Sequence, residues 1–334
     1  MATLNNTGPT NNSNQSHCVL KENFKYILLP ISYSLVFVVG LALNFTAMYI
    51  ILFRTKHWKP STIYMINLNI CDTLYILTLP FLIYYYADED DWPFSEPMCK
   101  LIRFLFYTNL YGSILFLSCI SLHRFLGICH PVRSLTCMNA RFARLVSLGI
   151  WVTLLIFQAP ILYFAKTRRN GSLLVCYDTS IKELFNSFLV YTSVVMLLLF
   201  ILPFGVVLVC NVLMVRKLQE PSIGGNSISK RSKQKSVKMI MIVLITFMSC
   251  FLPFHLNRSI YYGYRYLDLQ NCMTLHNSNV AYKLTRPLLS LNSCIDPILY
   301  FMVGQSFRNI INKKSKSSQR CDNAKFLSAL QLPV

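Results

Sequence analysis

Apolar residues along this chain gather into seven long runs that alternate with shorter polar segments. A helix needs about 20 apolar residues to cross the hydrocarbon core of a bilayer, and every run reaches that length. The runs cover residues 26–53, 62–86, 104–128, 145–164, 185–215, 239–262 and 280–303. The pattern therefore predicts an all-α membrane protein, a seven-transmembrane helix bundle whose two termini lie on opposite sides.

The composition indicates the same class of protein. Hydrophobic residues make up 54% of the 334 residues and charged residues only 13%, and the mean hydropathy is +0.44. Both values are typical of membrane proteins. The net charge of +19 comes largely from Lys and Arg in alternate polar segments. By the positive-inside rule these segments are cytoplasmic and the amino terminus is outside, so no nucleic-acid partner is needed to explain the charge.

Three regions follow from this topology. Residues 1–25 are rich in Asn, Ser and Thr and carry sequons at Asn5, Asn11 and Asn14, so they are predicted to be an extracellular glycosylated tail. Residues 26–303 form the seven-transmembrane domain. Residues 304–334 begin with GQSFRNIINKK, whose alternation of apolar and basic positions predicts a short amphipathic helix on the inner leaflet, followed by a cytoplasmic tail.

Four basic residues interrupt the last two runs: His255 and Arg258 in one, Lys283 and Arg286 in the other. The members of each pair are three residues apart and share a helix face. A charge at the centre of a membrane helix costs about 2.5–3.5 kcal/mol on translocon scales, so such residues usually face a wet cavity. We interpret the four as a cationic ligand site, the alternative being single side chains that extend to the membrane surface.

A further candidate face lies on the third run, where Arg103, Tyr107 and Tyr111 recur every four residues. An aromatic stripe of this kind more often packs helices together, but the accompanying Arg favours a binding face. Asp72 lies in the middle of the second run and needs a proton, a cation or strong hydrogen bonds. Later helices offer Ser113, Asn292 and Asp296, so a small cation site and a purely structural Asp are both open.

The predicted external segments carry an acidic run and four cysteines. Asp88, Glu89, Asp90 and Asp91 are expected to form a solvated loop. Oxidising conditions outside the cell favour a disulfide from Cys99 to Cys176 and another from Cys18 to Cys272, although four cysteines permit three pairings. At the opposite end of the third run, Arg124 lies where the helix meets the cytosol, and its plainest role is that of an interfacial anchor.

These residues together resemble the rhodopsin-like G-protein-coupled receptors over residues 24–314. The marks, in chain order, are Asn44, the LNICD run ending at Asp72, Cys99 with Cys176, HRF at 123–125, Trp151, Pro203, FLPF at 251–254 and NSCIDPILY at 292–300. Within that family the chain is similar to the metabotropic purinoceptors for extracellular nucleotides, especially the branch activated by uridine and adenine triphosphates. The runs RFLFYTNLYGSILFLSCIS, FLPFHLNRSIYY and YKLTRPLLSLNSCIDPILYF carry this likeness.

The resemblance implies roles for the candidate residues. The ligand's phosphates would be held by Arg103, His255, Arg258, Lys283 and Arg286, with Tyr107 and Tyr111 beside the ribose or base. Arg124 would act against a G protein, and the cluster of Asp72, Ser113, Asn292 and Asp296 would hold a sodium ion. The output would be Gq and phospholipase C from a multi-pass protein of the plasma membrane, with no cofactor.

Two departures and several alternatives accompany this interpretation. Phe125 and Asn211 stand where the family commonly has Tyr, and the second departure bears on basal activity and coupling.

The segment RTKHWKPSTIYMINL also resembles the oxoglutarate and succinate receptors, so a dicarboxylate receptor is the nearest rival. A receptor for a lipid mediator is disfavoured by so polar a site. A transporter would need internal symmetry, and an enzyme would need a nucleophile and base meeting at one depth; we find neither in the sequence.

Overall fold

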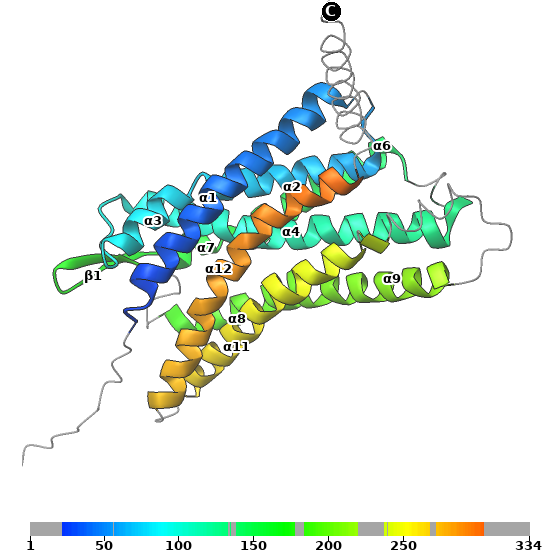
Figure 1. The fold of residues 1–334 in the computed structure, drawn as a ribbon. Helices are drawn as coiled ribbons and strands as arrows, with labels where there is room; N and C mark the ends of the chain where they lie inside the picture. The colour runs from blue at the N-terminus through cyan, green and yellow to red at the C-terminus, as the bar shows by residue number, and fades with distance from the viewer. Residues whose placement is uncertain are drawn as a thin grey trace, which may run out of the picture.

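The computed structural model describes residues 22–303 except for residues 56, 133, 135–137, 178–183, 220–236, 239 and 268–271. The predicted sequons, Cys18 and the amphipathic helix after residue 303 lie outside the described residues. Figure 1 shows long helices running side by side along the bundle, with a small hairpin at one end.

The described residues of each predicted span lie within a helical segment; residue 239, at the start of the sixth span, is not among them. In the part of the chain that the structure describes, six segments are long and apolar enough to cross a membrane: Lys25–Arg54, Pro60–Ala87, Glu96–Cys129, Ala140–Phe164, Phe185–Gln219 and Ile240–Tyr266. They contain α1 (Lys25–Tyr49), α2 (Pro60–Ile76), α3 (Leu79–Ala87), α4 (Glu96–Cys129), α6 (Ala140–Gln158), α7 (Ile161–Phe164), α8 (Phe185–Met196), α9 (Leu202–Gln219) and α11 (Leu252–Tyr266). The seventh segment, α12 (Cys272–Val303), is more polar because it carries Arg286, Asn292 and Asp296, all of which are buried in the bundle.

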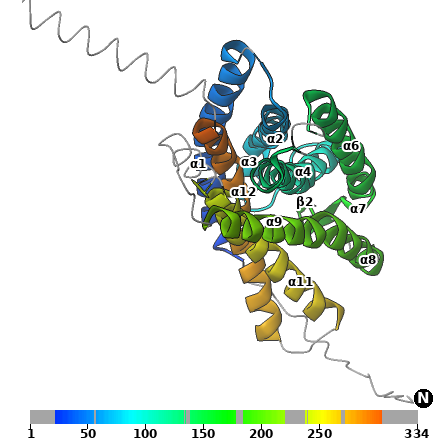
Figure 2. The same ribbon diagram turned by 90° about the vertical axis from the view of Figure 1, so that its right-hand side faces the viewer.

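Helix α4 lies in the middle of the bundle, flanked by α2, α6 and α9 (Figure 2). Its side chains Ile114, Phe116 and Leu117 are fully buried. Gly112 permits a close approach to α2, because a Cβ at that position would lie 2.8 Å from the sulfur of Cys71. The central helix therefore touches most of the elements that carry candidate residues.

Polar side chains join the helices around α4 to one another. The Asn44 amide on α1 donates to the Ser293 carbonyl on α12 at 2.8 Å, and the Asn69 amide on α2 donates to Asn44 Oδ1 at 2.9 Å. Trp151 Nε1 on α6 donates to Asn67 Oδ1 on α2 at 2.8 Å. Because a hydrogen bond left unmade in an apolar interior is costly, these contacts fix the register between the helices.

Proline distorts some helices and not others. The π-helical turns η3 (Leu197–Ile201) and η4 (Phe247–Phe251) come directly before Pro203 and Pro253. Proline lacks an N–H and clashes with the carbonyl four residues earlier, and a π-turn accommodates both. The helix is also interrupted at Pro160, which separates α6 from α7. Helix α12, in contrast, continues through Pro287 and Pro297.

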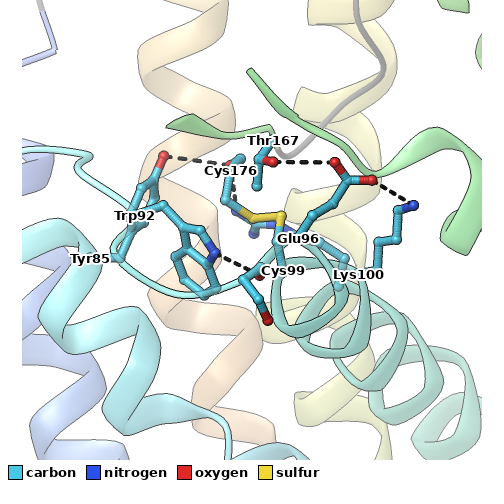
Figure 3. The surroundings of a disulfide bond; sticks show 9 residues. Tyr85, Trp92, Glu96, Cys99, Lys100, Thr167 and Cys176 are labelled. Carbon is cyan, nitrogen blue, oxygen red and sulfur yellow. Dashed lines mark hydrogen bonds and ion pairs between the residues drawn. A yellow bond between two sulfur atoms is a disulfide. The ribbon is translucent and has the colours of Figure 1, made fainter. Parts of the chain in front are cut away.

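One end of the bundle carries a β-hairpin that the all-α prediction did not include. Strand β1 (Thr167–Asn170) pairs antiparallel with β2 (Leu173–Cys176), with Gly171 at φ 63° in the turn. The disulfide between Cys99 and Cys176 ties this hairpin to the start of α4, so we call this the disulfide end of the bundle. The Tyr85 hydroxyl donates to the Cys176 carbonyl at 3.5 Å, and Thr167 to Glu96 at 3.3 Å (Figure 3).

The acidic run beside the hairpin is only partly solvated. Asp88 and Glu89 are exposed as predicted. Asp91 Oδ1 instead accepts from the Leu174 backbone N–H at 3.0 Å, and the Trp92 N–H donates to the Leu174 carbonyl at 2.7 Å. An edge strand leaves backbone groups that need partners, which explains why this part of the loop packs against the hairpin.

Candidate ligand-binding site

Five predicted basic residues reach the inside of the bundle at the disulfide end; we call Arg103, His255, Arg258, Lys283 and Arg286 the cationic cluster. Three helices supply them, namely α4, α11 and α12. His255 is 2% exposed, Arg258 5% and Arg286 4%, so these side chains do not extend to the surface. Their burial excludes the alternative of isolated side chains reaching for the headgroups.

Arg103 is held by the hairpin. Its Nη2 donates at 3.1 Å to the carbonyl of Cys176, which is itself a member of the disulfide. A carbonyl satisfies a guanidinium N–H without cancelling its charge. The disulfide therefore positions Arg103 as well as the hairpin.

Arg258 lies among aromatic rings. Its guanidinium carbon is 5.1 Å from the ring centre of Tyr107, 5.2 Å from that of Tyr262 and 5.9 Å from that of Phe254. Cation–π contacts of this length stabilise a buried cation. No acidic residue in the described part of the chain pairs with Arg258, so its charge remains available to an anion.

His255 is packed more tightly than Arg258, which lies on the same face of α11. Its ring stacks on Phe200 with centroids 3.9 Å apart and lies 5.8 Å from Tyr111. Its Nε2 is buried without a hydrogen-bond partner. His255 is therefore largely a core side chain with one polar atom left to bind.

Arg286 is oriented by two tyrosines. Its Nη1 donates to the Tyr86 hydroxyl at 2.9 Å and its Nη2 to the Tyr282 hydroxyl at 3.2 Å. The charges of both Arg258 and Arg286 act on Tyr107. Tyr86, Tyr262 and Tyr282 were missed at the sequence level, because tyrosine in an apolar run gives no signal beyond packing.

Lys283 differs from the other members because it forms an ion pair. Its ammonium contacts the carboxylate of Glu22, which also accepts from the Asn279 side-chain amide. Burial alone would raise the pKa of the Glu22 carboxyl, but the charges of Lys283 and Lys25 outweigh it and lower that pKa from 4.5 to about 2. The sequence held no sign of this pair, whose members are 261 residues apart.

The predicted acid cluster also comes together, on α2, α4 and α12; we call Asp72, Ser113, Asn292 and Asp296 the carboxylate cluster. Asp72 Oδ1 accepts from the Asn109 amide and from the Ser293 hydroxyl, each at 2.8 Å. Asp72 Oδ2, the Ser113 hydroxyl, the Asn292 amide and both carboxylate oxygens of Asp296 are buried without a hydrogen-bond partner. A small cavity lined by Asn69, Asp72 and Asp296 adjoins them.

Arg124 lies at the opposite end of α4. Its side chain is half-buried and its Nε has no hydrogen-bond partner, while the neighbouring His123 Nδ1 lies 3.0 Å from the sulfur of Met138. Asn211 on α9 is 2% exposed, and neither atom of its amide has a partner. Two polar groups near this end thus lack partners within the described bundle.

The predicted disulfides have two outcomes. The bond from Cys99 to Cys176 is present. Cys272 is also disulfide-bonded, but its predicted partner Cys18 lies outside the described residues.

Comparison with known proteins defines the family. The model of the 7 transmembrane receptor (rhodopsin family) matches residues 43–300. The chain is 55% identical to P(2)Y purinoceptor 2 of Homo sapiens over 288 residues, which are 86% of this chain and 76% of that receptor. The chain belongs to the P(2)Y purinoceptors of the rhodopsin family.

Other purinoceptors of this group match over more of the chain. It is 46% identical to purinoceptor 4 of Rattus norvegicus over 312 residues, or 93% of this chain and 86% of that one. Against purinoceptor 1 of Meleagris gallopavo the identity is 39% over 332 residues, or 96% and 90%. Membership of the P(2)Y purinoceptors confirms the predicted family and the prediction of a receptor rather than an enzyme.

Proposed function

We propose that the protein is a plasma-membrane receptor for extracellular nucleotides of the UTP or ATP kind. The observation that carries this is the burial of Arg103, Arg258 and Arg286 among tyrosines at the disulfide end. Guanidiniums bind phosphate oxygens in a two-pronged geometry, and charge-assisted hydrogen bonds are the strong ones. The names of the relatives, purinoceptors 2, 4 and 1, support a purine or related nucleotide as the ligand.

Different residues would bind different parts of the ligand. The three arginines, with Lys283 and His255, would hold the phosphates, and Tyr107 and Tyr111 would lie beside the ribose or base. The ring planes of Tyr107 and Tyr111 are 15° apart with centroids at 6.4 Å, so they present one continuous aromatic face. Such a face suits a flat sugar or base next to the charged groups.

The other candidate groups complete the receptor. Sodium prefers oxygen ligands, so Asp72, Ser113, Asn292 and Asp296 would hold a sodium ion, whose single positive charge would offset one of the two buried carboxylates. Arg124 would contact a G protein of the Gq class, with phospholipase C and calcium as output. The disulfide end and the glycosylated tail at Asn5, Asn11 and Asn14 would be extracellular.

A dicarboxylate such as 2-oxoglutarate or succinate is the second candidate ligand. The observation that favours it is the pair of Lys283 with Glu22, which shows that the cationic cluster accepts a carboxylate. Two carboxylates would use fewer of the cations than a triphosphate does. We therefore rank it below the nucleotide.

Intracellular calcium in cells expressing the chain tests the proposal, with UTP, ATP, UDP, ADP, succinate and 2-oxoglutarate applied separately. We expect a triphosphate response that Arg258→Ala and Arg286→Ala each weaken about 100-fold, within the 2–5 kcal/mol typical of truncating a buried charge pair. Arg169→Ala is the matched control, because Arg169 lies on the same end but is exposed on β1. A response to a dicarboxylate with silence to every nucleotide would contradict the proposal.

A further inference from the structure

Glu22, the first residue that the structure describes, lies between α1 and α12. Its carboxylate contacts Lys283 and Asn279 on α12 and the ammonium of Lys25 on α1. The Glu22 side chain is 17% exposed and that of Lys283 13%. An ion pair this far from solvent is screened less than a surface pair.

The position of Glu22 is fixed by contacts on the side away from Lys283. Lys25 also pairs with Asp90 of the acidic run, and Asp90 accepts from the Tyr26 hydroxyl at 3.0 Å. Asp90 and Glu89 hold left-handed backbone conformations, at φ 73° and 51°, that are sparsely populated by residues other than Gly, Asn and Asp. Asp90, Lys25, Glu22 and Lys283 thus form a row of alternating charge from the acidic loop to α12.

This row ends inside the candidate site. Lys283 lies three residues before Arg286 on the same face of α12, and the charges of Glu22 and Arg286 both act on its ammonium. A second anion placed on Lys283 would stand next to the Glu22 carboxylate, where two like charges repel. Lys283 can therefore serve Glu22 or a ligand anion fully, but not both.

We propose that Glu22 is an internal competitor for the ligand anion at Lys283, and that a ligand gains the use of Lys283 only by displacing this carboxylate. The inference rests on the proposed role of the cationic cluster in anion binding. Glu22 then makes the site select ligands by the number of their negative charges. A ligand can reach Arg103, Arg258 and Arg286 without displacing Glu22, so a ligand with few charges gains little from Lys283, whereas a triphosphate gains more.

The test uses Glu22→Gln in the purified full chain, with thermal stabilisation by each of four anions giving apparent affinities. The anions are UTP, UDP, succinate and inorganic tripolyphosphate. Gln keeps an acceptor for Asn279 and removes the charge. We expect the variant to bind UTP about tenfold more tightly, equivalent to about 1.4 kcal/mol, and to gain less with UDP and succinate.

Three further variants separate competition from a general charge effect. Asp90→Asn removes the same charge from the same row but does not touch Lys283, so its UTP affinity should change much less than that of Glu22→Gln. In a Lys283→Gln background, Glu22→Gln should have no effect, because the two residues are coupled. Glu22→Asp keeps the charge and should restore an affinity close to that of the unchanged receptor.

The outcomes are distinct. Weaker anion binding by Glu22→Gln, or an equal gain in the Lys283→Gln background, overturns the inference and makes Glu22 a residue that positions Lys283. Stabilisation by succinate alone, tightened by Glu22→Gln, contradicts the proposed nucleotide function while supporting the internal competitor. If no anion stabilises either the unchanged receptor or Glu22→Gln, there is no anion for Glu22 to exclude and the inference fails.

Discussion

Two groups of buried polar side chains lie on the same helices of this bundle, Arg103 and Arg286 in the cationic cluster and Ser113 and Asp296 in the carboxylate cluster. The arginines have protein partners: the Cys176 carbonyl for one, the Tyr86 and Tyr282 hydroxyls for the other. The Ser113 hydroxyl and both oxygens of Asp296 are buried without a hydrogen bond of ordinary length, although Ser113 and Asn292 lie near enough to act on the Asp296 carboxyl. One group is held by short hydrogen bonds to its surroundings, and the other is not.

This difference shows that satisfying the hydrogen bonds of a buried group is not the same as neutralising its charge. Carbonyls and hydroxyls satisfy the N–H groups of an arginine without carrying a negative charge, and such contacts orient Arg103 and Arg286. In the carboxylate cluster two acids face each other, and a proton or a cation is needed before both can stay buried. The charge of Lys283 is paired with that of Glu22.

The largest effect is expected from breaking the support of the cationic cluster. Cys176→Ser removes the bond that ties the hairpin to α4, and the loss of such a disulfide costs about 2–5 kcal/mol. We expect little receptor at the cell surface and a calcium response weakened about 100-fold, the latter because Arg103 loses its fixed carbonyl. Cys119→Ala is the control, since Cys119 is a free thiol on the same helix. A normal response from Cys176→Ser would show that the hairpin does not position Arg103.

A smaller effect is expected from the carboxylate cluster. A sodium ion that binds only the folded state stabilises it, by about 2.7 kcal/mol at 100 times its dissociation constant. The unfolding temperature of the purified receptor should therefore rise when sodium replaces choline, and Asp72→Asn should abolish the rise. Ser121→Ala, which removes another buried hydroxyl without a partner on α4, should keep it. A rise that survives Asp72→Asn would place the ion elsewhere.

A single hydroxyl should have a still smaller effect. Tyr86→Phe removes one of the two tyrosine acceptors of Arg286 and keeps the aromatic ring. Hydrogen bonds to charged groups contribute about 1.5 kcal/mol or more, so the potency of UTP should fall about tenfold. Tyr84→Phe serves as the control because the Tyr84 side chain is 48% exposed. Equal potencies for the two variants would mean that Tyr86 does not orient Arg286 for the ligand.

The smallest expected effect is that of pH on the Glu22 pair. The pKa of Glu22 is lowered from 4.5 to about 2, so the contribution of this carboxylate to stability is complete above pH 4.5 and is lost as the pH falls toward 2. Between pH 7.5 and about 5.5 Glu22 stays ionised, and the ratio of UTP affinities between Glu22→Gln and the unchanged receptor should stay constant. A ratio that falls toward one over this range would mean that Glu22 takes up a proton much more readily.

Features that depend on runs of residues could be predicted from the sequence, and features that depend on distant partners could not. The seven spans and the gathering of basic residues at one end followed from hydropathy and spacing, whereas the four external cysteines left three disulfide pairings open. The role of Tyr86 depends on a partner 200 residues away, and that of Glu22 on one 261 residues away. Neither pair has a local pattern, because side chains so far apart meet only through the packing of whole helices.

The hairpin was missed for a related reason. Its strands Thr167–Asn170 and Leu173–Cys176 are four residues each, too short for alternation to be recognised. They are stabilised by the disulfide and by Asp91 rather than by their own propensity. Asp91 was expected to be solvated because a run of acids usually is.

The π-turn η4 helps to set the orientation of two residues of the candidate site. Phe247–Phe251 carries an extra residue compared with a regular turn, and His255 and Arg258 follow it. Each residue of an α-helix turns the chain by about 100°. Closing this turn into a regular α-helix without removing the extra residue would rotate the chain beyond it by about 100° and swing Arg258 away from Tyr107. The direction in which Arg258 points therefore depends on a local irregularity of the backbone as well as on the spacing of residues along the helix.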